Sequence, residues 1–114
     1  MAHGDKLYLS HILDAADRIE QYLAHVELVA FLDDSLRQDG VIRQLAIIGE
    51  AVKRLSADLR SSATDVPWTD IAGMRDRLVH DYMGVDLEAV WKTATEDVPA
   101  LREVVRRLIA TNSF

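Results

Sequence analysis

The chain contains no cysteine, which excludes disulfide bonds, thiolate zinc sites and cysteine nucleophiles. It has only five glycines and two prolines, a poor supply for the many tight turns of a β-sandwich or barrel. No stretch approaches the roughly 20 uncharged apolar residues of a membrane span, and the first residues lack the apolar run of a signal peptide. We therefore expect a protein of the cytoplasm that does not engage a membrane.

Basic residues are in the minority. Lysine and arginine number 13 against 19 aspartates and glutamates, for a formal net charge of −6. This balance argues against a general coat for nucleic acid or for a membrane surface. Ten of the 13 basic residues are arginine, the better residue for bidentate phosphate contacts. A small local phosphate site is therefore compatible with the acidic total.

Apolar residues make up 49% of the 114 residues, enough for the core of one domain spanning residues 1–114. Their spacing by three and four predicts helices almost throughout. The third expected helix has a heptad-like seam formed by Leu45, Ile48, Val52, Leu55 and Leu59. The expected fold is an all-α bundle of four main helices plus one short extra helix. The helices are expected near residues 5–25, 27–36 (the short one), 41–60, 67–82 and 87–108, the last kinked at Pro99.

Breaks between the helices are predicted from a few local signals. Asp39 and Gly40 together indicate an interruption before the third helix. Residues 61–65 form the clearest loop, and Thr64 or Asp65 is placed to cap the fourth helix. Asp86 is placed to cap the fifth helix in the same way.

One segment, residues 73–82, concentrates the side chains that phosphodiester cleavage can use. An imidazole such as that of His80 moves protons near neutral pH. A guanidinium such as that of Arg75 holds a phosphate and stabilises charge that develops on it. The phenol of Tyr82 can donate a hydrogen bond or be modified. The segment also contains Asp76 and Arg77.

Helical geometry complicates a joint role for Arg75 and His80. Five residues separate them, so on an ideal helix their side chains point about 140° apart. Either the helix loosens before His80, or a second copy of the chain completes the site. A two-fold dimer would bring two such segments face to face, so we expect a homodimer.

Structural explanations compete with these roles. Arg77 and His80 could stabilise the end of a helix, or Arg77 could pair with Asp81 one turn later. Glu50 interrupts the apolar third helix, either at a solvated edge or as a partner of Arg75 or Arg77. The residue types alone leave these alternatives open.

The segment resembles the R-x4-H-x-Y signature of the HEPN superfamily, in its HepT-like (DUF86) branch. Arg75, His80 and Tyr82 match the three fixed positions, and Asp76 supplies the polar residue that commonly follows the arginine, although asparagine is the residue expected in this branch. The likeness extends over roughly residues 5–110. It includes Leu45–Lys53, Pro67-Trp68, the run Gly73–Tyr82, and Gly84-Val85-Asp86 followed by Val90-Trp91.

The resemblance implies a helical bundle that dimerises and cleaves RNA, with transfer RNA a reasonable substrate, without a metal or other cofactor. Arg75 and His80 would be catalytic, and Asp76, Arg77 and Glu50 would support them. The family implies a toxin of a toxin–antitoxin pair, whose partner is a small MntA-like nucleotidyltransferase. That partner would silence the toxin by adenylylating Tyr82.

A second function fits the sequence as well. The acidic net charge favours a binding or docking subunit for a nucleotidyltransferase without catalysis, since RNA binding depends largely on neutralising phosphates. Residues 75–82 hold two arginines against two aspartates, so the segment itself has no formal excess of positive charge.

Overall fold

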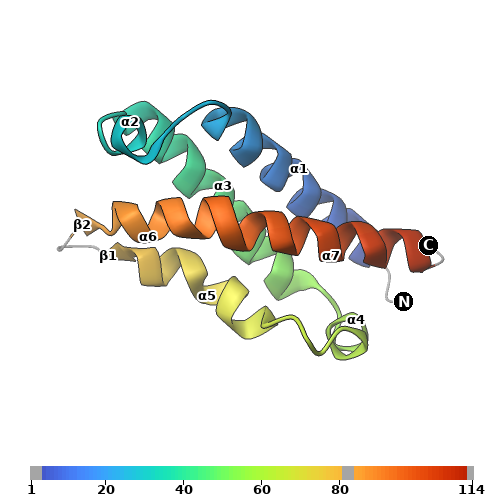
Figure 1. Cartoon of the computed structure of the whole chain (residues 1–114). Coiled ribbons are helices and arrows are strands. Elements are labelled where there is room, and N and C mark those ends of the chain that lie inside the picture. Colours follow the sequence, from blue (N-terminus) through green and yellow to red (C-terminus); the bar gives the residue numbers. More distant parts are fainter. Residues whose placement is uncertain (1–3, 81–83, 113–114) are drawn as a thin grey trace.

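The structure, a computed structural model, describes residues 4–80 and 84–112, with the side chain of His80 left out of the description. Figure 1 shows the order of the elements along the chain. They are α1 (Asp5–Leu23), α2 (Leu28–Leu32), α3 (Ser35–Arg54), α4 (Ala57–Ser62), α5 (Trp68–Leu78), β1 (Val79–His80), β2 (Gly84–Val85), α6 (Leu87–Lys92), the π-helical turn η1 (Thr93–Asp97) and α7 (Val98–Thr111).

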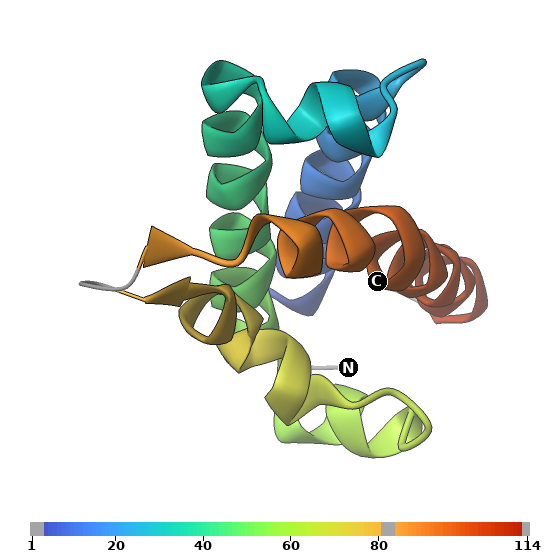
Figure 2. The ribbon, with the colours of Figure 1, turned by 60° about the vertical axis from the view of Figure 1, so that its left-hand side comes forward.

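The main helices form two layers. α3 packs between α1 and α5, while α6, η1 and α7 follow one another and cross this layer, with α6 near α3 and α5 and α7 on α1 (Figures 1 and 2). The expected all-α bundle with four main helices is therefore confirmed. Within the described residues two short helices accompany them, α2 and α4, where one was expected. The two-residue strands β1 and β2 are a minor addition.

The seam predicted for the third helix forms the centre of the core. Its five apolar residues are each at most 2% exposed, and they pack with buried residues of α1 such as Leu9, Ile12 and Ile19. The seam thereby holds α3 in the middle of its layer. None of the helices in the described part of the chain is long and apolar enough to cross a membrane.

The interruption expected at Asp39 and Gly40 is wrong, because α3 begins at Ser35 and runs through both residues. The start is fixed by Asp34, whose carboxylate accepts a hydrogen bond from the backbone N–H of Arg37 (3.1 Å). Gly40 fits closely against Tyr22: a Cβ there would lie 3.3 Å from the tyrosine ring. The glycine thus permits close helix packing rather than ending the helix.

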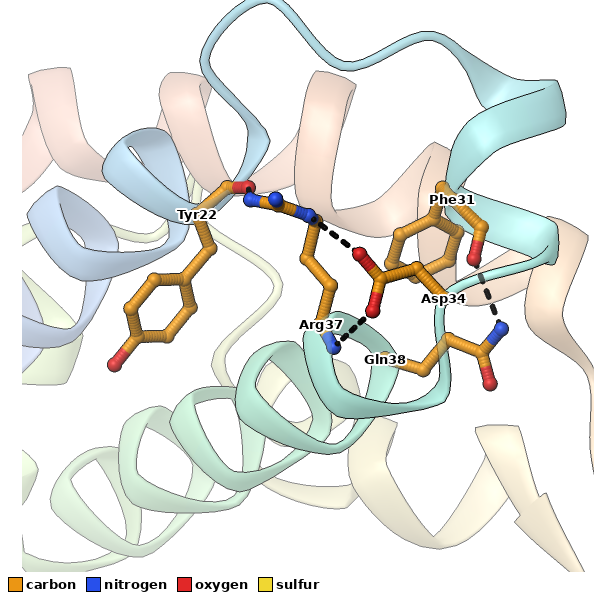
Figure 3. A network of polar contacts seen from close by, with 5 residues as sticks. All are labelled: Tyr22, Phe31, Asp34, Arg37 and Gln38. Atoms are coloured by element: carbon orange, nitrogen blue, oxygen red, sulfur yellow. Dashed lines mark hydrogen bonds and ion pairs between the residues drawn. The ribbon is translucent and has the colours of Figure 1, made fainter.

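Side chains at this turn tie three elements together (Figure 3). The Arg37 guanidinium donates to Asp34 and to the carbonyl of Tyr22 at the end of α1, while Gln38 donates to the carbonyl of Phe31 in α2. The hydrogen bond from the Arg37 backbone, followed by that from its side chain, lowers the pKa of the Asp34 carboxyl. These contacts fix how the chain enters α3.

The other end of this helix also differs from the expectation. α3 ends at Arg54 rather than near residue 60, and Ser56 caps the separate helix α4 by accepting from the backbone N–H of Leu59 (3.1 Å). Asp5, 2% exposed, accepts from the backbone N–H (2.9 Å) and the hydroxyl (2.6 Å) of Ser56. These two long-range hydrogen bonds hold the turn between α3 and α4, although the apolar spacing continues through it from Leu55 to Leu59.

Nearby side chains also fix the starts of α5 and α6. α5 begins at Trp68 after Pro67 with no side-chain cap, so the expected capping by Thr64 or Asp65 is wrong; the Trp68 indole N–H donates instead to the carbonyl of Ala63 (3.0 Å). The cap at Asp86 is confirmed, since its carboxylate accepts from the backbone N–H of Ala89 (3.1 Å). Pro99, where a kink or a restart near Asp97 was expected, lies in the first turn of α7, which begins at Val98 directly after η1.

Candidate functional site

A close approach between two helices positions α5, which carries the first half of the candidate segment. Gly49 of α3 is buried, and a Cβ on it would lie 3.0 Å from the backbone oxygen of Ala72 in α5. Any larger residue would push the helices apart. The glycine therefore fixes the position of α5 one turn before Arg75.

Arg75 lies in the last turn of α5, on the stripe that follows Ala72 and faces α3. Its side chain is 44% exposed, and its guanidinium lies 3.5 Å from the carboxylate of Asp76. An exposed surface pair of this kind is weak. The guanidinium is therefore accessible to an anion, and Asp76 is placed to orient it.

The backbone leaves the helical conformation directly after this turn. α5 ends at Leu78, and Val79 and His80 continue as β1, which pairs with β2 so that His80 lies opposite Gly84. The backbone N–H of Asp86 donates to the carbonyl of Leu78 (3.0 Å) and closes the loop. Of the two alternatives from the sequence, the helix does loosen before His80.

Two of the expected site groups, the His80 side chain and Tyr82, lie outside the described part of the chain. The backbone of His80 belongs to β1, but its side chain is not described. Tyr82 and Asp81 lie outside the described residues, in the three positions between the two strands. The roles assigned to these residues stay predictions.

Arg77 points away from the side of α5 that bears Arg75. It donates to the backbone oxygen of Asp70 (2.9 Å), and its guanidinium lies 3.9 Å from the Asp70 carboxylate. It lines a cavity of about 440 Å³ between α5 and the η1–α7 segment, with apolar walls such as Ile71 and Leu101. Within the described residues the structure therefore does not bring Arg75 and Arg77 together.

Glu50 is also separate from both arginines of α5. Its carboxylate is paired with Lys53 of the same helix (3.2 Å), and its side chain is 63% exposed. Of the two alternatives from the sequence, the described part of the chain therefore shows the solvated edge position.

Sequence reasoning missed a second group of cationic and aromatic residues beside Glu50. A shallow hollow of about 450 Å³ lies between α1 and α3 and is lined by Tyr8, His11, Arg43, Ala46, Ile47, Glu50, Ala51 and Arg54. The helical spacing of residues 43, 47, 50 and 54 places them on one face of α3, which is only one side of the hollow. The other side is formed by two aromatic residues of α1, more than 30 positions earlier in the chain than Arg43, so no local sequence pattern contains the whole group.

The site can bind and neutralise a phosphate through Arg75, and an imidazole at position 80 could move protons beside it. In residues 4–80 and 84–112, no three histidine, aspartate or glutamate side chains gather to hold a metal ion. The described part of the site thus consists of one accessible guanidinium at the end of α5, next to a change of backbone direction.

The comparisons with known proteins agree with one another, and their matches cover nearly the whole chain. The family described as "Ribonuclease HepT-like" matches residues 12–108. A "probable ribonuclease HepT" of Thermococcus cleftensis is 40% identical over 95% of this chain and 98% of its own. A "putative RNase" of Caldanaerobacter subterraneus is 36% identical over 90% of this chain and 91% of its own.

A third relative is larger. The "gamma-glutamylcyclotransferase and putative RNase" of Methanocaldococcus jannaschii is 38% identical over 91% of this chain, which spans 47% of that protein. No solved structure matches the chain.

Proposed function

This chain belongs to the HepT-like ribonuclease family, and we propose that it is an endoribonuclease that cuts RNA with Arg75 and His80 and without a metal ion. The observation that carries the proposal is the end of α5. Arg75 stands exposed in the last helical turn, and the backbone turns out of the helix between it and His80. The 140° divergence belongs to one continuous helix, so it does not apply to a segment whose helix ends at Leu78.

The chemistry needs only these two side chains and the RNA itself. In its neutral form, the His80 imidazole takes the proton from a ribose 2′-hydroxyl. The freed oxygen attacks the adjacent phosphorus, and the bond to the 5′-oxygen of the next nucleotide breaks. That leaving oxygen takes up a proton from the His80 imidazolium or from solvent. The products are a 2′,3′-cyclic phosphate and a 5′-hydroxyl, while Arg75 stabilises the charge on the phosphate oxygens.

We propose further that the chain works as a homodimer and as the toxin of a toxin–antitoxin pair. In this proposal an MntA-like nucleotidyltransferase adenylylates Tyr82 and so silences the nuclease. The resemblance described above supports this assignment. A dimer would also cover the exposed apolar side chains on the surface, which include Val29 (80% exposed) and Leu36 (84% exposed).

The alternative is a non-catalytic subunit that docks a nucleotidyltransferase. The net charge of −6 favours it, because a polyanionic substrate is repelled by a generally acidic surface. The cavity beside Arg77 has three aspartates on its rim, Asp65, Asp70 and Asp97, and would suit a basic protein partner better than RNA.

A cleavage assay separates the two functions. Wild type, Arg75→Ala, His80→Ala and the control Arg107→Ala, which changes an exposed arginine on α7, are incubated with total RNA and then with a defined transfer RNA. We expect both site variants to lose about 100-fold or more in rate, the typical contribution of a positioned acid–base group. The control should cut like wild type. Absence of cleavage by every protein, including wild type, would favour the docking subunit.

A further inference from the structure

The hollow between α1 and α3 is a surface site to which the proposed function assigns no role. Its floor is formed by small and branched apolar side chains, Ala46, Ile47 and Ala51, and its rim by Tyr8, His11, Arg43, Glu50 and Arg54. The two arginines come from the same face of α3, eleven positions apart. At 1.5 Å per residue this is a span of roughly 16 Å.

The arginines of the hollow are not committed to carboxylates. Within residues 4–80 and 84–112, five of the ten arginines form ion pairs, and neither Arg43 nor Arg54 is among them. Glu50, the one acidic residue of the hollow, is already paired with Lys53. The hollow is therefore a locally cationic surface on a chain whose formal net charge is −6.

The aromatic residues of the hollow add a stacking surface and help orient one arginine. The Arg54 guanidinium lies 6.0 Å from the centre of the Tyr8 ring, within the range of a cation–π interaction. The exposed ring of His11 meets Tyr8 edge-on, with centres 5.8 Å apart. Cationic groups interleaved with aromatic rings are the combination that binds single-stranded nucleic acid.

The hollow and the candidate catalytic segment both border α3, which packs between α1 and α5. Ala46, which lines it, is one helical turn from Gly49 on α3, and Arg75 is one turn from Ala72 on α5. Because α3 and α5 run in opposite directions (Figure 1), Ala46 and Arg75 lie on the same side of the Gly49–Ala72 contact. Adjacent packed helices are about 8–10 Å apart, a short step for an extended nucleotide chain.

We infer that the hollow binds the RNA strand next to the nucleotide that is cut. Phosphates of the strand contact Arg43 and Arg54, and a base stacks on the ring of His11. This inference rests on the proposed ribonuclease function and names a second contact region for the same substrate. It offers an acidic protein a way to hold a polyanion, because Arg43 and Arg54 on α3 add positive charge to that of Arg75 on α5.

The inference is tested by binding to an uncleaved RNA. The full chain carrying His80→Ala is titrated with a fluorescently labelled 12-nucleotide RNA over a range of salt concentrations. Arg43→Gln and Arg54→Gln are then added together, and the control adds Arg106→Gln and Arg107→Gln instead. Both pairs remove two exposed positive charges, so the net charge of the two proteins is the same, and neither pair disturbs the core.

Loss of two phosphate contacts should weaken binding about 10- to 100-fold at low salt, and should reduce the slope of log K against log salt by roughly 1.4. The control should bind like the His80→Ala parent. Equal affinity of the Arg43/Arg54 variant and the parent would overturn the inference, as would an equal loss in the control. A fall from dimer to monomer mass in the Arg43/Arg54 variant alone, measured by light scattering, would also overturn it, because the hollow would then be an interface between two copies.

Failure of the inference is distinct from failure of the proposed function. The otherwise unmodified chain is assayed for RNA cleavage in parallel. Cleavage by that chain together with unchanged binding by the Arg43/Arg54 variant rejects only the binding hollow. Absence of both cleavage and RNA binding by the unmodified chain rejects the ribonuclease and, with it, the hollow.

Discussion

The carbonyl oxygen of Ala72 lies only 3.0 Å from the position that a Cβ on Gly49 would take. This contact sets the distance between α3 and α5 at the point where α5 carries Arg75. A glycine inside a helix usually lowers its stability. Its presence in the middle of α3 is explained by this close approach.

Two helical glycines provide a matched test of that contact. Gly73 lies within α5 with nothing within 4 Å of an added Cβ, so Gly73→Ala should stabilise the protein by roughly 0.5–1 kcal/mol through helix propensity. Gly49→Ala gains the same propensity but presses on a backbone oxygen, and overpacking of this kind costs about 1–3 kcal/mol. Urea denaturation should therefore rank Gly73→Ala above wild type and Gly49→Ala below it. Equal stabilisation by both substitutions would contradict the close contact.

The sequence predicted the main helices because their apolar periodicity is strong. The seam from Leu45 to Leu59 is buried as expected, and Asp86 caps α6. The errors arose where long-range contacts override local signals. Gly40 continues a helix because Tyr22 packs on it, and α3 ends before Ser56 because Asp5 binds that residue from 51 positions away. No local pattern encodes either contact.

For the candidate site, the sequence indicated the local geometry of residues 75–80 but not the contacts of Arg77 or the hollow. The spacing of Arg75 and His80 left two alternatives, that the helix loosens before His80 or that a second copy completes the site, and α5 does end at Leu78. The position of Arg77 was not predictable, because its partner Asp70 lies seven residues earlier, beyond the usual spacing of side-chain pairs on one helix. The hollow on α1 and α3 depends on the packing of two helices, which the pattern within one helix does not reveal.

The cap at Asp34 gives a pH dependence whose sign follows from its contacts. Hydrogen bonds from the backbone and side chain of Arg37 hold the pKa of this carboxyl below its ordinary value of 3.8. The stabilisation is therefore complete above the unfolded pKa and is lost as the pH falls through the folded pKa. The difference in unfolding free energy between wild type and Asp34→Ala should shrink from pH 7 towards pH 3. An exposed neighbour, Asp33→Ala, serves as the control, and a difference that grows on acidification would contradict the prediction.

The proposed chemistry makes cleavage independent of divalent metal ions, since Arg75 neutralises the phosphate and His80 moves the proton. Treatment with EDTA should leave the cleavage rate of wild type within about twofold, because no step of the proposed chemistry requires a metal. The products, analysed by mass spectrometry, should carry 2′,3′-cyclic phosphate ends. Cleavage that EDTA abolishes and magnesium or manganese restores would contradict the proposed mechanism.

The last prediction concerns Tyr82 and the proposed partner. In the expected reaction the tyrosine oxygen attacks the α-phosphate of ATP, pyrophosphate leaves, and the phenolic proton passes to solvent or a base. The product carries a new phosphate, about one negative charge, and a purine two residues after His80. An added phosphate is the type of group that an arginine captures, so the adenylyl group should compete with RNA for Arg75. Wild type incubated with the nucleotidyltransferase and ATP should therefore gain the mass of an adenylyl group and lose cleavage.

Tyr82→Phe removes only a hydroxyl and should gain no such mass, while its nuclease activity should persist in the presence of the partner and ATP. Tyr22→Phe, which alters a tyrosine at the turn between α1 and α3, is the matched control and should be modified and silenced like wild type. The regulatory role of Tyr82 fails if Tyr82→Phe gains the same mass as wild type, or if wild type is modified without losing activity. A large loss of cleavage in unmodified Tyr82→Phe would instead place the hydroxyl in contact with the phosphate, and would make this residue part of catalysis as well as its target for control.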